Sequence, residues 1–114
     1  MFFRNISNLL LTYYIKYAII YYRKGVETVP TISMFYGIIV RMFNNGEHNP
    51  PHFHATYQDE NAVFNMDGEL VKGSMPNKQQ KLIAAWAAIH RDELLANWEL
   101  AMNEQPLYKI DPLR

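Results

Sequence analysis

The spacing of the apolar residues changes at Gly73, and this change limits the folds open to the chain more than any other feature. Before Gly73, short runs rich in β-branched and aromatic residues alternate with turn-forming pairs, which is typical of strands. After it, apolar residues recur at helical spacing. Strands followed by helices, rather than interleaved with them, indicate a small α+β domain.

Two segments in the first half of the chain predict strands, and one of them contains candidate functional residues. Thr31–Phe43 has β-branched and aromatic residues around Gly37, which predicts either one long strand with a bend or two strands. His52–Gln58 alternates, so His52 and His54 should share one face while the apolar residues between and after them take the other.

A hairpin is expected at the Asp67-Gly68 pair. It separates the extended runs Asn61–Met66 and Glu69–Lys72, and a type I′ turn requires positive φ at both central residues, which Asp-Gly tolerates. The sheet is therefore expected to be mostly antiparallel, with three or four strands.

Two C-terminal helices are expected to cover one face of this sheet. Ser74 is a cap candidate and Pro76 an early proline for the first helix. The two apolar stripes do not align, which predicts a break near His90–Asp92 with Asp92 as an N-cap. Gln105–Arg114 is bracketed by prolines and reads as an extended tail or edge strand. The stripes comprise Leu82, Ile83, Trp86 and Ile89, then Leu94, Leu95, Trp98, Ala101 and Met102.

Composition excludes several functional classes. The 114 residues contain no cysteine, so a disulfide framework, a thiolate metal site and a cysteine nucleophile are ruled out, and a reducing, cytoplasmic compartment is expected. Eleven basic and eleven acidic residues give no net charge, which disfavours binding of nucleic acid by bulk electrostatics. The sequence also lacks phosphate-loop, Gly-x-Ser-x-Gly and His-Glu-x-x-His signatures.

Residues 1–28 differ from the rest and are interpreted as an extension outside a single domain of residues 29–114. Their net charge is +3, against −3 for residues 29–114. The apolar stretch Leu9–Tyr22 contains Lys16 and is shorter than the roughly 20 residues of a membrane span. No signal-peptide cleavage site follows. Translation from a GTG codon at Val29 is a further hypothesis, and no membrane contact is expected for residues 29–114.

The segment Glu47–His54 holds the residues best suited to chemistry. His52 and His54, two positions apart on a strand, can share one divalent transition metal such as zinc. A further ligand or a general base could come from Glu47, His48, Asp59 or His90. The simpler interpretation is that the histidine pair binds loop carbonyls and orders the Pro50-Pro51 turn. His90 is then most simply a helix cap, and Trp86 and Trp98 are core residues.

The chain resembles a small prokaryotic family, the family catalogued as domain of unknown function 4160. The resemblance covers residues 29–113 and rests on the run Val29–Ile38, on Pro50-Pro51-His52-Phe53-His54-Ala55, and on Ile89–Leu95 with Asn97-Trp98. Members usually begin Met-Pro-Thr, which supports a start at Val29. The family motif carries over to Pro50, Pro51, His52, His54 and Trp98, and less firmly to His90, and it assigns none of them a chemical role.

Two functions follow as hypotheses. Genes of this family often neighbour those of another small domain, so the resemblance implies a binding or regulatory module with a small protein partner in a toxin–antitoxin-like pair. The alternative is a metal-dependent hydrolase or nuclease in which His52 and His54 bind the cation while Glu47, His48 or His90 moves protons.

Overall fold

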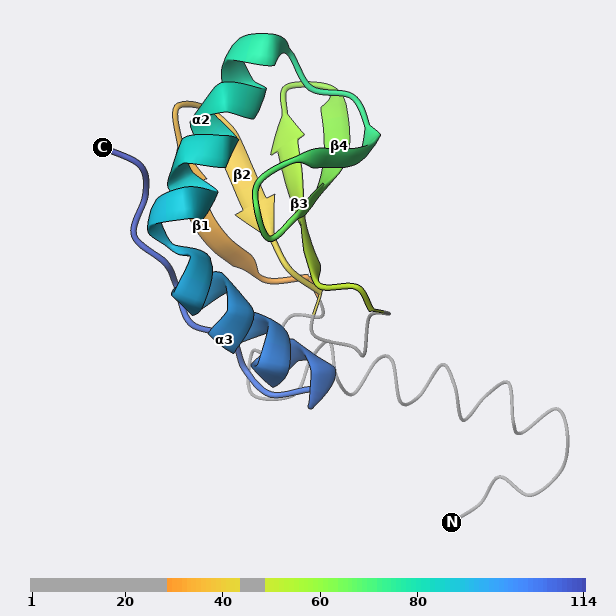
Figure 1. Ribbon diagram of the computed structural model, residues 1–114, viewed down its shortest axis with the longest axis vertical. Coiled ribbons are helices and arrows are strands. Elements are labelled where there is room, and N and C mark those ends of the chain that lie inside the picture. The colour runs from red at the N-terminus through yellow and green to blue at the C-terminus, as the bar shows by residue number, and fades with distance from the viewer. Residues whose placement is uncertain (1–28, 44–48) are drawn as a thin grey trace, which may run out of the picture.

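The computed structural model describes residues 29–43 and 49–114, so the expected extension, residues 1–28, lies outside the described residues. The described chain forms five strands and two helices (Figure 1). The strands are β1 (Thr31–Phe35), β2 (Ile38–Arg41), β3 (His52–Tyr57), β4 (Glu60–Asn65) and β5 (Leu70–Gly73), and the helices are α2 (Asn77–Ile89) and α3 (Arg91–Met102). The expected α+β fold is confirmed.

The strands form one antiparallel sheet in the order β1-β2-β3-β4-β5. It therefore has five strands rather than three or four. The difference arises because Thr31–Phe43 forms two strands and both arms of the hairpin at Gly68 join the sheet. A tight turn separates β1 from β2, with φ of 49° at Tyr36 and 80° at Gly37. Gly37 adopts this left-handed conformation without strain.

The alternation within β3 separates core from surface as expected. Phe53 and Ala55 are buried, whereas His52 and His54 are half-buried on the opposite face. The buried side chains of the other strands join Phe53 in a single core beneath the helices. This core contains Ile32, Phe35, Ile38, Val40, Met42, Phe53, Ala55, Ala62, Phe64, Met66, Met75, Ile83, Trp86, Ala87, Leu94, Trp98, Ala101 and Ile110.

Helix α2 lies across one face of the sheet, and α3 continues from it beyond the end of the strands (Figure 1). Trp86 anchors α2: its side chain is fully buried, and its ring centroid lies 5.3 Å from that of Phe35 and 5.7 Å from that of Phe53. None of the helices in the described part of the chain is long and apolar enough to cross a bilayer.

The helix boundaries differ from the expected caps. The helical region is interrupted at His90, which is the C-cap of α2 and the N-cap of α3, so the expected break between the two helices is confirmed. Asp92, however, lies in the first turn of α3 rather than at its N-cap, where its carboxylate still faces the positive end of the helix dipole. Ser74 does not cap α2, which starts directly after Pro76 without a side-chain cap.

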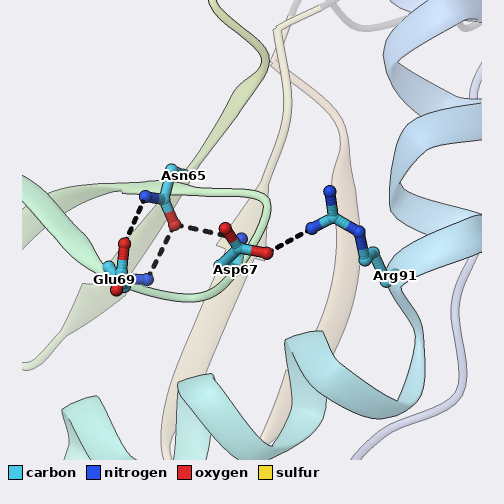
Figure 2. Close-up of polar contacts among 4 residues, drawn as sticks. All are labelled: Asn65, Asp67, Glu69 and Arg91. Carbon is cyan, nitrogen blue, oxygen red and sulfur yellow. Dashed lines mark hydrogen bonds and ion pairs between the residues drawn. The ribbon is translucent and has the colours of Figure 1, made fainter.

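The β4–β5 turn is held by a side chain, as Figure 2 shows. Asn65 Oδ1 accepts hydrogen bonds from the backbone N–H groups of Asp67 and Glu69, and Asn65 Nδ2 donates to the Glu69 carboxylate. Gly68 has a positive φ of 79° but Asp67 does not, so the expected type I′ geometry is wrong. Asp67 also pairs with Arg91 of α3; since both side chains are well exposed, this pair contributes less than about 1 kcal/mol.

The chain after α3 runs back along β1 as an extended segment (Figure 1). It contains no strand, so an edge strand does not form there. Instead, the Ile110 N–H donates to the Ile32 carbonyl at 2.7 Å, and Trp86 Nε1 donates to the Asp111 carbonyl at 2.8 Å. The buried Asn97 side chain makes two further bonds to the backbone of Tyr108. This segment therefore occupies the β1 side of the domain.

Candidate functional site

Strand β3 brings the two candidate histidines together. The strand begins directly after Pro50-Pro51, and its two-residue period places His52 and His54 on the same face. Their ring centroids are 5.3 Å apart with an interplanar angle of 68°. The Asn49–Pro50 peptide bond just before the strand is cis.

His52 is tied to the loop and to α3. Its Nδ1 lies 2.9 Å from the Pro50 carbonyl oxygen. Because a carbonyl only accepts, Nδ1 is the donor and Nε2 is the nitrogen with a lone pair in the neutral ring. The ring centroid also lies 5.0 Å from that of Trp98, which is buried in the core. His52 therefore makes the loop contact that the metal-free interpretation requires.

His54 packs against the end of β2 instead. Its ring stacks on that of Phe43, with centroids 4.3 Å apart and an angle of 7° between the planes. This stacking fixes the imidazole plane on the face of the sheet opposite α2.

The remaining proposed ligands do not complete a metal site in the described part of the chain. Within residues 29–43 and 49–114, no group of three or more His, Asp or Glu side chains is arranged to hold a metal. Glu47 and His48 lie outside the described residues. His90 sits at the α2–α3 junction, where its ring packs 5.8 Å from Trp86 and its Nδ1 contacts the Glu93 carboxylate. The histidine pair thus contributes at most two ligands from the described chain.

A row of side chains crosses the outer face of the sheet, the face opposite α2. Directly paired residues of an antiparallel sheet lie on the same face, and the register joins Arg41, His54, Val63 and Lys72 in this order. Around the row lies a pocket of about 360 Å³, within the size range of ligand sites. Its lining includes Arg41, Phe43, His54, Thr56, Asn61 and Lys72.

Most of the residues that line the pocket do not belong to a sequence motif, so the sequence did not predict them. His54 was singled out through the His-x-His pattern, but Arg41 and Lys72 are single basic residues in separate strands, 31 positions apart in the numbering. The alternation of β2 and β5 gives a weak signal of their outward direction. The register of four strands places them in one row with His54.

The structure thus defines a small α+β domain with a pocket on the outer face of its sheet. The chain belongs to the family described as Domain of unknown function (DUF4160), whose model matches residues 37–99. This range includes Pro50, Pro51, the two histidines of β3 and Trp98. No curated protein and no solved structure matches the chain.

Proposed function

We propose that the domain is a non-catalytic binding module that recognises a small protein partner by adding an extended segment of that partner to β5. In this proposal the partner is the product of the adjacent gene, the two proteins form a toxin–antitoxin-like pair, and the module acts in the cytoplasm. The exposed edge of β5 is the observation that carries the proposal.

Strand β5 ends the sheet and all four of its residues are exposed. Leu70 and Val71 are apolar side chains with exposed fractions of 37% and 62%. A strand at a sheet edge offers unpaired backbone N–H and C=O groups to another chain, and natural proteins usually shield such edges. The apolar exposure at β5 therefore favours a strand-adding partner.

The opposite edge is used differently. The C-terminal segment contacts β1 through the Ile110–Ile32 hydrogen bond and is fixed there by Trp86 and Asn97. This contrast between the two edges supports assignment of the partner to β5. The register shift beside Val71, which twists the edge locally, would restrict pairing to a segment that fits it.

The test is binding of the co-expressed product of the adjacent gene, measured by calorimetry after co-purification. Val71→Lys places a charge on the edge strand and should weaken binding at least tenfold. Ile89→Lys is the matched control, since Ile89 is equally exposed, at 66%, but lies at the end of α2; it should change the affinity less than twofold. Absence of a complex, or equal loss in both variants, would contradict the proposal.

A metal-dependent hydrolase or nuclease remains the second candidate, favoured by one observation: the same-face rings of His52 and His54 at 5.3 Å. Their separation is compatible with joint ligation after small rotations of the side chains. A catalytic site would need a third protein ligand and an open position for water, and Glu47 and His48 are the residues this candidate would assign to that task.

Titration of Zn²⁺, Mn²⁺ and Ni²⁺ into the metal-free chain separates the two candidates. The binding module predicts no tight, saturable uptake by the wild type, since two imidazoles make a weak site. Stoichiometric binding that disappears in the His52→Ala/His54→Ala double variant would instead support the hydrolase and would justify a screen for divalent-metal-dependent cleavage.

A further inference from the structure

We infer that the pocket on the outer face of the sheet is a carboxylate-binding site, which takes acidic side chains of a polypeptide segment that crosses the face from β5 towards β2. This inference rests on the proposed function for the origin of the segment, and it adds the chemistry that the partner must present.

The charge of the lining points to an anionic ligand. Arg41 and Lys72 are basic, and the described residues of the lining include no Asp or Glu. Ion pairs between described side chains lie elsewhere, joining His90 to Glu93 and Arg91 to Asp67. The positive charge of the pocket is therefore not neutralised by the described chain, and each of two carboxylates that enter it would gain one favourable partner.

The neutral part of the lining suits a carboxylate on an apolar stem. Thr56 Oγ1 donates to Asn61 Oδ1 at 2.9 Å, which leaves the Nδ2 group of Asn61 as a donor for a ligand oxygen. Phe43, stacked on His54, provides a flat apolar wall for methylene groups. Donors and apolar surface thus converge on one cavity.

The spacing of the two cations predicts the pattern of the segment. Arg41 on β2 and Lys72 on β5 are separated by three strand spacings, or roughly 14 Å at about 4.8 Å per strand. An extended chain covers this distance in about four residues at about 3.3 Å each. The matching segment therefore carries two acidic residues about four positions apart.

Charge outside the pocket favours a polypeptide over a nucleic acid. Residues 29–114 have a net charge of −3, and α3 carries three acidic residues, Asp92, Glu93 and Glu99, against one basic residue, Arg91. A nucleic acid would meet this negative surface along its length and would gain only a small basic area. A short acidic peptide avoids the conflict because its charges stay within the pocket.

The test uses fluorescence anisotropy with the full chain and a labelled eight-residue peptide of serine and threonine with glutamates at positions 2 and 6. We expect saturable binding that weakens at least tenfold when both glutamates are replaced by glutamine. The Arg41→Gln/Lys72→Gln double variant should lose at least tenfold as well. Lys78→Gln/Lys81→Gln, which removes the same charge from exposed positions of α2, should change the affinity less than twofold.

Three outcomes would overturn the inference: no binding by the wild type, equal loss in the two double variants, or tighter binding of an oligothymidylate than of the peptide to the same residues. Thermal unfolding of each variant checks that the fold is retained. Calorimetry of the Arg41→Gln/Lys72→Gln variant with the adjacent gene's product separates the two claims. Unchanged partner affinity overturns the assignment of the pocket to the partner and leaves the proposed function standing, whereas peptide binding without any partner complex overturns the proposed function alone.

Discussion

Gly68→Ala is expected to lower the free energy of unfolding by about 3 kcal/mol or more, although it adds only one methyl group, because Gly68 is buried against α2. A Cβ at this position would lie 2.7 Å from the Ala84 Cα and 3.1 Å from the Ala87 Cβ. Both atoms belong to α2, so the helix would have to move. The positive φ of 79° adds roughly 1 kcal/mol of backbone strain for any L-residue.

Gly37→Ala is the matched control for this change. Gly37 has nearly the same φ, 80°, but a Cβ there would meet only the ring of Tyr57 at 3.3 Å, and a half-buried side chain can shift. We expect a loss of about 1 kcal/mol, the cost of the backbone strain alone. Urea unfolding followed by circular dichroism measures both variants. Equal losses would show that the β4–β5 turn does not rest on α2 as described.

Trp86→Ala is expected to cost about 4 kcal/mol, which approaches the whole stability of a small domain. The fully buried indole fills the space between α2 and the sheet against Phe35 and Phe53. Its loss leaves a cavity at the centre of the core and also removes the hydrogen bond to Asp111. We therefore expect a largely unfolded chain near 37 °C, measured by thermal unfolding and by proteolysis of the C-terminal segment.

Trp86→Phe separates the contribution of ring packing to stability from that of the hydrogen bond to Asp111. The smaller ring retains most of the contact with the sheet, while the Asp111 carbonyl loses its Nε1 donor, so a loss of about 1–2 kcal/mol is expected. Proteolysis of the C-terminal segment should accelerate even though the core remains folded. A Phe variant as unstable as the Ala variant would contradict this division of roles.

Local patterns predicted the elements better than their ends. The period of two in β3 correctly assigned Phe53 and Ala55 to the core, and helical spacing assigned Trp86 and Trp98 to it. The turn at Gly68 was predicted but its geometry was not: Asp67 keeps a negative φ, and the Asn65 side chain adds hydrogen bonds from the Asp67 and Glu69 N–H groups to the backbone bonds of the turn. Side-chain contacts of this kind leave little trace in the pattern of apolar residues.

The candidate site was predictable only in part. Strand geometry alone placed His52 and His54 on one face, and the structure shows their rings side by side. The pocket depends on the pairing of β2 with β3 and of β4 with β5, which joins residues far apart in the chain. Sequence alternation gives the side on which Arg41 and Lys72 lie but not their register. The register between strands that are distant in the sequence cannot be predicted from a single sequence.

The central claim is that a partner segment pairs with β5, and hydrogen–deuterium exchange of the full chain tests it most directly. Exchange is compared with and without the co-expressed product of the adjacent gene. We predict slower exchange of backbone amides in Leu70–Gly73 on complex formation, because new inter-strand hydrogen bonds protect them, with unchanged exchange in α2. Protection confined to α2 and α3, with β5 unaffected in a stable complex, would contradict the account.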